Sequence, residues 1–262
     1  GSKARIKHNN LGLRLDKDIT IKKPEGKKRL ILLGDSFVWG LELDQEETIA
    51  YQMQKQLGEE WEVIPIATIG YGTDQELLAL KEIGLKLDPD MIMLFFYQND
   101  LSNNVDTLQN YAHKPRYIVN PDMNLQLINY PTIGVMQYPF QKEEMFDKPI
   151  KRFFMSNFHT YMFIESKKSK FEKDKPKKEF KPKDSELWGV KKSYSGWETN
   201  TYFLFLAIVD EFKKISRDNN IPFVFVNIPS RLNVDPEYQE RFVEQFKGVE
   251  LSDFDFTSLT RS

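Results

Sequence analysis

The fold of this chain is decided by the stretch RLILLGDSF, residues 29–37. Its apolar run Leu30-Ile31-Leu32-Leu33 ends at Gly34, and the polar pair Asp35 and Ser36 follows at once. Unbroken apolar runs of this length are typical of strands that are buried on both faces, as in a parallel sheet. The stretch therefore predicts a buried strand that ends in a polar turn with a serine.

The same alternation continues along the chain. Further strands are predicted at residues 63–67, 91–97 and 222–228, and apolar residues at helical spacing predict helices over 46–57, 74–87, 198–219 and 236–246. Strands that alternate with helices at this density indicate an α/β fold with right-handed crossovers. We expect a three-layer α/β/α, flavodoxin-like domain with a mainly parallel sheet of four or five strands. Asp74 is expected to cap the helix that follows it, and Val249 to open the fifth strand.

One domain spanning residues 1–262 fits the length of the chain, with a long insertion inside it. Residues 101–195 show little regular periodicity and are predicted to form a cap over or beside the site. Within the insertion, residues 165–183 hold nine lysines and four acidic residues, a local charge of +5. We expect this segment to be a basic, mobile flap rather than a specific anion site.

The composition excludes several classes of function. The 37 Lys and Arg residues nearly balance the 39 Asp and Glu residues, so a general nucleic-acid binder is not expected. No apolar run approaches the ~20 residues that cross a bilayer, so no membrane span is expected in this chain. The absence of Cys excludes disulfides, thiol catalysis and thiolate-held metals, and three His residues argue against a His-rich centre. Neither a cofactor nor a metal is expected.

Polar residues follow three of the predicted strands. Gly34-Asp35-Ser36-Phe37 follows the first, Gly70-Tyr71-Gly72-Thr73 the second and Gln98-Asn99-Asp100 the third. The carboxyl ends of parallel strands meet at one edge of a sheet, which is where ligands bind. A nucleophilic serine needs backbone N–H groups or a side-chain amide aimed at the developing oxyanion, and this edge offers both kinds of donor.

Each of these residues also has a purely structural interpretation. Ser36 could cap a helix, Gly70 could be an ordinary turn glycine, and Asn99 could form an Asx turn. The aromatic residues Trp39, Tyr71 and Tyr97 could line a pocket or pack in the core.

The three blocks at 34–37, 69–73 and 98–100 resemble, in order, the signature blocks of the GDSL, or SGNH, hydrolases. The stretches 9–14 and 70–76 are also similar to bacterial extracytoplasmic members of that family. The resemblance covers residues 9–104 well and residues 196–250 loosely.

The resemblance implies that Ser36 is the nucleophile. It also implies an oxyanion hole made of the Ser36 N–H, the Gly70 N–H and the Asn99 side chain, with Asp35 tying down the turn. The implied activity is hydrolysis of acyl esters through a Ser36 acyl-enzyme, on small-molecule or glycan esters, with acetyl esters of carbohydrates as the expected class. An extracytoplasmic location, periplasmic, secreted or membrane-anchored, is implied as well.

The chain departs from the family in its general base. That family supplies the base from a C-terminal Asp-x-x-His block, and no such motif precedes Ser262. We expect the sequence to be cut short of this block, with Asp253 or Asp255 as candidates for the acid partner of the missing histidine. The opening Gly1-Ser2 is similarly expected to replace the natural N-terminus.

Two histidines of the insertion, His113 and His159, are weaker alternatives for the base. Without a base, Ser36 is a poor nucleophile at neutral pH, so we expect slow turnover by this chain.

Three other functions remain open from the residues. An O-acyltransferase acting on a cell-surface glycan would differ only in the group that attacks the acyl-enzyme. A non-catalytic binding module would keep the pocket and lack the histidine. A flavodoxin-like nucleotide binder is disfavoured because both Gly-x-Gly-x-x-Gly and the P-loop motif are absent. The sequence leaves the oligomeric state open.

Overall fold

The computed structural model describes residues 4–109, 112–132 and 196–244. All of these residues except Ala112 belong to one compact unit. A second unit, residues 110–112 and 134–182, lies almost wholly outside the described residues. The predicted basic flap and the predicted strand at Val249 also lie outside them.

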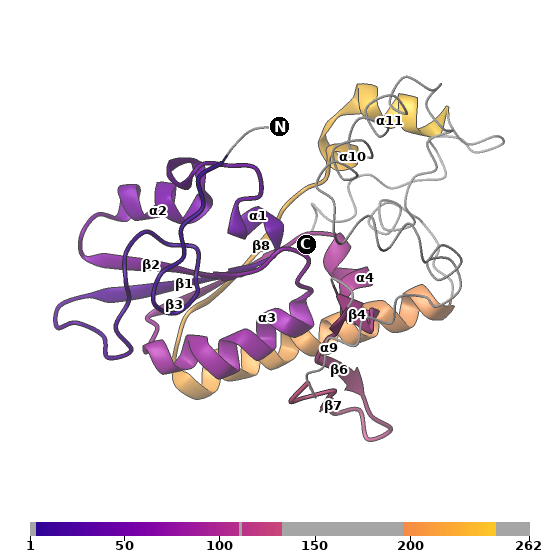
Figure 1. Ribbon diagram of the computed structural model, residues 1–262. Coiled ribbons are helices and arrows are strands. Elements are labelled where there is room, and N and C mark those ends of the chain that lie inside the picture. The colour runs from indigo at the N-terminus through magenta and orange to yellow at the C-terminus, as the bar shows by residue number, and fades with distance from the viewer. Residues whose placement is uncertain (1–3, 110–111, 133–195, 245–262) are drawn as a thin grey trace, which may run out of the picture. The chain divides into compact units, whose positions relative to one another are not determined.

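A four-stranded parallel sheet forms the centre of the described unit (Figure 1). It contains β1 (Lys28–Gly34), β2 (Trp61–Ala67), β3 (Met91–Phe96) and β8 (Phe223–Asn227), in the order β2-β1-β3-β8. All three pairings are parallel, which confirms the predicted α/β fold with a parallel sheet. The order corresponds to the first four strands of flavodoxin-like folds.

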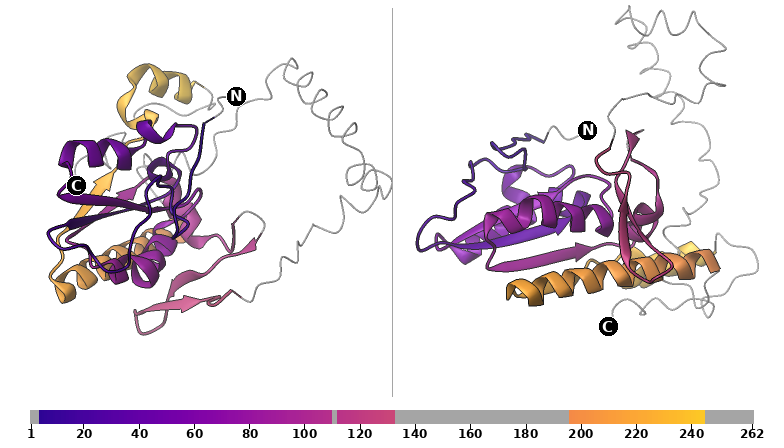
Figure 2. Two further views of the ribbon diagram at one scale, coloured as in Figure 1. Left: turned by 60° about the vertical axis from the view of Figure 1, so that its left-hand side comes forward. Right: turned by 90° about the horizontal axis from the view of Figure 1, so that it is seen from below.

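Helices cover both faces of this sheet (Figure 1). On one face lie α1 (Ser36–Trp39) and α2 (Ile49–Leu57), and on the other lie α3 (Thr73–Ala79) and α9 (Gly196–Asn219). Two further views show α9 running beside α3 (Figure 2). The three predicted layers are therefore present.

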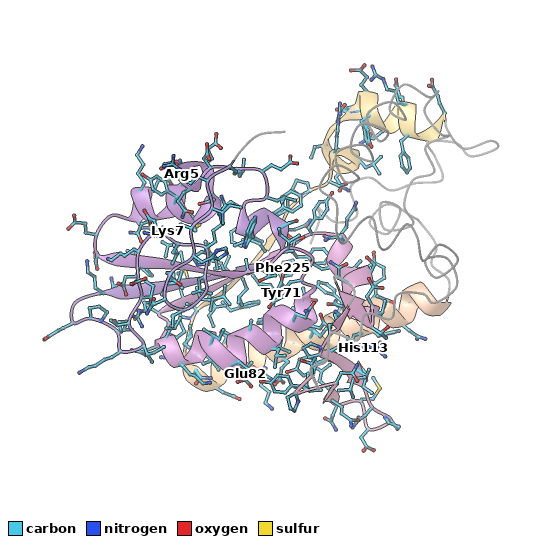
Figure 3. All side chains as sticks on the ribbon, in the orientation of Figure 1. Arg5, Lys7, Tyr71, Glu82, His113 and Phe225 are labelled. Atoms are coloured by element: carbon cyan, nitrogen blue, oxygen red, sulfur yellow. The ribbon has the colours of Figure 1, made fainter. Side chains whose placement is uncertain are left out.

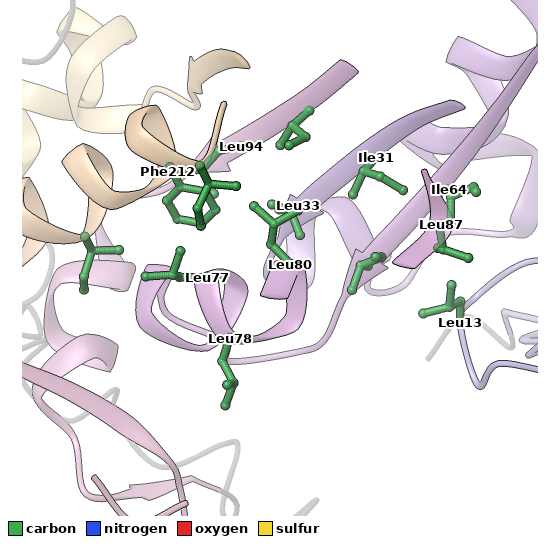
Figure 4. Close-up of a cluster of buried hydrophobic side chains, with 14 of the residues drawn as sticks. Leu13, Ile31, Leu33, Ile64, Leu77, Leu78, Leu80, Leu87, Leu94 and Phe212 are labelled. Carbon is green, nitrogen blue, oxygen red and sulfur yellow. The ribbon is translucent and has the colours of Figure 1, made fainter. Parts of the chain in front are cut away.

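The core is divided between the two faces because successive strand residues point to opposite sides. Ile31 and Leu33 of β1 join Leu77 and Phe212 in one cluster (Figure 4). The intervening β1 residue Leu32 faces the second cluster, with other strand residues and with residues of α1 and α2. Each fully buried aliphatic side chain contributes about 1.5–3 kcal/mol relative to exposure, so these two layers fix the sheet.

Shorter elements complete the described unit. They are η1 (Gln45–Glu47), η2 (Leu80–Gly84), η3 (Leu85–Leu87), α4 (Asn99–Val105), β4 (Leu108–Gln109), β5 (Ala112–His113), β6 (Arg116–Val119), β7 (Leu125–Ile128), α10 (Arg231–Val234) and α11 (Pro236–Val243). Strands β6 and β7 pair antiparallel. None of the described helices is long and apolar enough to cross a membrane.

The helix predicted over 74–87 differs from the structure in two ways. First, it divides into α3, a π-helical turn (η2) and a 3₁₀ turn (η3). Gly84 ends the π-helical turn, and a Cβ at this position would lie 2.8 Å from Leu80 Cδ1. Second, the N-cap of the helix is Gly72 and not the predicted Asp74, because α3 begins at Thr73. The Asp74 N–H donates instead to Asn104 Oδ1 of α4 at 3.0 Å, which leaves the Asp74 carboxylate for another partner.

The first part of the predicted insertion packs against the sheet domain. Helix α4 contacts α3 and α9, and β6 contacts α9. Leu101 of α4 is fully buried and Tyr117 of β6 belongs to the core cluster on the α3 side of the sheet. The remaining residues of the insertion, 133–195, are outside the described part of the chain.

Candidate active site

The Ser36 side chain stands at the turn between β1 and α1. Gly34 is the last residue of β1, and a Cβ there would lie 2.3 Å from Val38 Cγ2, so only glycine permits this tight strand-to-helix turn. Ser36 is the first residue of α1 and is half-buried. Its backbone N–H has no acceptor among the described residues, as expected for the first turn of a helix.

Asp35 is a buried carboxylate that connects two of the predicted site blocks. Its Oδ1 accepts the N–H of Phe37 at 2.9 Å, and its Oδ2 accepts the side-chain amide of Asn99 at 3.0 Å. The same Oδ2 lies 3.4 Å from Ser36 Oγ, at the outer limit of a hydrogen bond. Asp35 thus ties the turn after β1 to the turn after β3.

Asn99 is the first residue of α4 and lies beside the Ser36 turn rather than in the apolar core. One of its two amide hydrogens is used by Asp35. The other has no acceptor in the described part of the chain, and the carbonyl oxygen Oδ1 is buried without a donor there. An amide of this kind retains a hydrogen for a ligand.

Gly70 occupies the turn after β2. The Tyr71 N–H donates to the Thr68 carbonyl at 3.1 Å, and Gly70, the third residue of this turn, has a φ of 79°. That conformation is typical of a type II turn and favours glycine. The Gly70 N–H has no acceptor among the described residues, and no hydrogen bond found there joins Gly70 to Ser36 or Asn99.

No described histidine serves Ser36. His113 lies on β5 with an exposed side chain (Figure 3), and His8 lies near Trp39 with 6.4 Å between ring centroids. Neither donates to or accepts from Ser36. His159 and the acidic candidates Asp253 and Asp255 lie outside the described residues. In the described ranges, no three His, Asp or Glu residues are grouped as metal ligands.

Phe37, the residue after Ser36, is in contact with a second aromatic residue. The Phe37 ring is 42% exposed, and its centroid lies 4.6 Å from that of Tyr97. Trp39, by contrast, packs under the Arg14 guanidinium, 4.6 Å from its central carbon. Of the predicted aromatic residues, Tyr97 therefore contacts the residue that follows Ser36. The sequence had not singled out Phe37 itself.

A group of buried carboxyls lies behind the site, which the sequence did not predict. Glu76 and Asp100 are fully buried, and burial together with neighbouring carboxylates raises the pKa of each well above its usual range. Burial also raises the pKa of Asp74 to about 6, against the opposing effect of Lys114. The only sequence signal for this group is the polar stretch at the start of the predicted helix, residues 73–76.

Lys114 is the cation of this group. Its ammonium donates to Asp74 Oδ2 at 3.0 Å and Oδ1 at 3.1 Å, to Gln75 Oε1 at 3.4 Å, and to the Asn103 carbonyl. Lys114 is 3% exposed. It therefore links the segment after β5 to the first turn of α3 and to α4.

The raised pKa values predict a pH-dependent stability. Because folding favours the protonated forms of Glu76 and Asp100, the folded state holds more protons than the unfolded state, and the free energy of unfolding should fall as pH rises through the raised values. Glu76→Gln removes one ionisation, so between pH 5 and pH 8 the fall should become shallower, by up to about 1.4 kcal/mol per pH unit. Urea unfolding at several pH values measures this slope.

Glu82→Gln is the matched control, because Glu82 is exposed. Its carboxylate forms a long surface ion pair with Lys86, at 3.7 Å. It should leave the slope unchanged. An unchanged slope in Glu76→Gln as well would mean that Glu76 is ionised in the folded state at neutral pH.

Comparisons with known proteins give limited similarity. No protein-family model matches the chain, and no curated protein is detectably similar to it. Among solved structures, TesA is 22% identical over 30% of this chain and 46% of its own, with a TM-score of 0.28. A GDSL-like lipase from Bacteroides thetaiotaomicron is 11% identical over 78% of this chain and 70% of its own, with a TM-score of 0.29.

The lipase/acylhydrolase from Enterococcus faecalis is 16% identical over 81% of this chain and 82% of its own, with a TM-score of 0.28. The match to TesA spans less than half the length of that protein. TM-scores this low establish no shared fold, so the fold assignment rests on the order and register of the sheet itself.

Proposed function

We propose that this chain is a serine ester hydrolase of the SGNH type, with Ser36 as its nucleophile. The observation that carries the proposal is the shared Asp35 carboxylate, which accepts the Phe37 N–H at 2.9 Å and the Asn99 amide at 3.0 Å. It brings a half-buried serine and a neutral amide donor together at the carboxyl edge of a parallel sheet. This is the edge at which α/β folds bind their ligands.

The unpaired donors give further support. The Ser36 N–H, the Gly70 N–H and one Asn99 amide hydrogen have no acceptor among the described residues. The Ser36 N–H would be unpaired in any helix of this kind, whereas the Gly70 N–H and the Asn99 amide hydrogen could each have found a protein acceptor. Together the three donors are free to bind one acceptor of a ligand. An ester carbonyl that becomes an oxyanion is an acceptor of this kind.

In the proposed reaction, Ser36 Oγ forms a bond to the ester carbonyl carbon and its proton passes to a base. The carbonyl oxygen becomes an oxyanion that accepts hydrogen bonds from the three donors. The bond to the alcohol oxygen then breaks, the alcohol leaves with the proton, and water splits the Ser36 ester to release the acid. Acetyl esters of carbohydrates are proposed as substrates on family resemblance alone.

Covalent labelling tests the proposal without requiring full turnover. A p-nitrophenyl alkylphosphonate transfers its phosphonyl group to an activated serine and leaves an anionic, tetrahedral adduct that resembles the transition state. We expect intact-mass measurement to show one adduct and peptide mapping to place it on Ser36. Ser36→Ala should remove the adduct.

Ser216→Ala is the matched control, since Ser216 lies on α9 and donates to the Ile221 carbonyl. It should be labelled like the parent chain. Labelling of another serine would contradict the proposal. Saturable binding of the phosphonate without any adduct would favour the non-catalytic binding module instead.

A further inference from the structure

Two of the proposed oxyanion donors lie on segments that are joined by buried and half-buried side chains. Gly70 belongs to the turn that precedes α3, and Asn99 is the first residue of α4. The contact between these two segments is polar, although two of its three side chains are fully buried. It is formed by Thr73 of α3 and by Asn103 and Asn104 of α4.

Asn104 holds the first turn of α3. Its Oδ1 accepts the Asp74 N–H at 3.0 Å, and its Nδ2 donates to Thr73 Oγ1 at 2.7 Å. Asn104 and Thr73 are both fully buried. The backbone comes so close that a Cβ on Gly72 would lie 2.6 Å from Asn104 Oδ1, so glycine is required by the contact itself.

Asn103 holds the Gly70 turn directly. Its Nδ2 donates to the Tyr71 carbonyl at 3.1 Å, and the Tyr71 N–H closes the turn on Thr68. The carbonyl of Gly70's neighbour is therefore fixed by a residue of α4. A change in this contact would move the Gly70 N–H with it.

Helix α4 carries the constraint to Asn99. It is only one to two turns long, and the Ser102 hydroxyl donates to the Asn99 carbonyl at 2.8 Å, which ties the first residue to the same short helix as Asn103 and Asn104. Asn99 is fixed at its other end by Asp35. The Gly70 N–H and the Asn99 amide are thus held in place through the hydrogen-bonded side chains of four residues. These are Thr73, Ser102, Asn103 and Asn104.

We propose that Asn103, Asn104 and Thr73 are positioning residues, which set the separation of the Gly70 N–H from the Asn99 amide. The inference rests on the proposed function, because it assigns these residues to the same oxyanion. The separation matters because donors stabilise an oxyanion only at hydrogen-bond distance from it. A displacement of a donor by about 1 Å can lower the rate about 10²-fold.

A double-mutant cycle tests this positioning role. Thr73→Val removes the hydroxyl that pairs with Asn104 and keeps the shape of the side chain, whereas Thr73→Ser keeps the hydroxyl. In the full chain we expect Thr73→Val to slow phosphonate labelling of Ser36 about tenfold, and Thr73→Ser to restore most of that rate. In an Asn99→Ala background, Thr73→Val should change the rate by less than about twofold, because one of the two donors is already absent.

The cycle separates positioning from a loss of structure. Circular dichroism at the labelling temperature identifies folded variants, and Asn103→Ala, at a half-buried position, replaces Thr73→Val if the latter does not fold. Equal slowing by Thr73→Val in both backgrounds, or no slowing at all, would overturn the positioning role while Ser36 labelling in the parent chain stands. If the parent chain is not labelled on Ser36, the proposed function fails and this inference fails with it.

Discussion

Replacing Lys114 by methionine is expected to lower the free energy of unfolding by about 3–5 kcal/mol at pH 8. The ammonium is 3% exposed and lies 3.0 Å from Asp74 Oδ2, whose side chain is fully buried. Removal of the cation would leave the Asp74 carboxylate buried without its ion-pair partner, with only the longer-range attraction of Arg116. Breaking a buried pair from one side has a cost of this size because the remaining charge is not hydrated and has lost its direct partner.

The loss should depend on pH. The pKa of Asp74 is about 6 with Lys114 present, and it should rise further once the cation is removed. At pH 5 the carboxyl is then protonated in the folded state, so the destabilisation should be smaller than at pH 8. Urea unfolding of the parent chain and Lys114→Met at the two pH values measures both effects.

The double variant Asp74→Asn with Lys114→Met provides the control. It removes both charges together and should recover much of the lost stability, as matched replacements of buried pairs do. If the double variant were less stable than Lys114→Met alone, the ion pair would not be the source of the loss.

Removal of the Asn99 amide is expected to slow the labelling of Ser36 by about 10²–10³-fold. This is the effect of deleting one oxyanion donor in a site that excludes water, because that donor acts mainly on the charge of the transition state. In Asn99→Ala the folded state should persist, since the side chain is half-buried and outside the apolar core. The second-order rate constant of labelling, followed by intact mass, is the measurement.

Asn124→Ala serves as the matched asparagine control, because Asn124 is exposed in the turn between β6 and β7. It should label at the parent rate. A loss of less than about threefold in Asn99→Ala would mean that the amide serves only to hold Asp35, and Asn99 would leave the proposed oxyanion hole.

The strands of the sheet could be predicted because their signal is local. A continuous apolar run such as Leu30–Leu33 can be satisfied only between two covering layers, so its burial on both faces follows from the sequence. The placement of Ser36 and Asn99 at one edge follows from the same logic, since parallel strands share a carboxyl edge. The link between the two residues through Asp35 could not be predicted, because the Asp35 and Asn99 side chains meet only in the folded chain.

The polar contacts behind the site could not be predicted for a physical reason. Asn104 and Lys114 are hydrophilic by composition, and their burial is favourable only because partners distant in sequence satisfy them. A sequence of this kind is indistinguishable from a solvated loop until the partner is known. The misassigned cap at Asp74 has the same origin, because a side chain from α4 took over the capping position.

Pro65 lies in the middle of β2, opposite Leu32 of β1, and β2 is an outer strand of the described sheet. Proline has no N–H, so the free side of this strand lacks a main-chain donor at its centre. A foreign strand could not build an unbroken hydrogen-bond ladder along it. The residue therefore protects the domain from intermolecular strand addition and from aggregation while the sheet assembles.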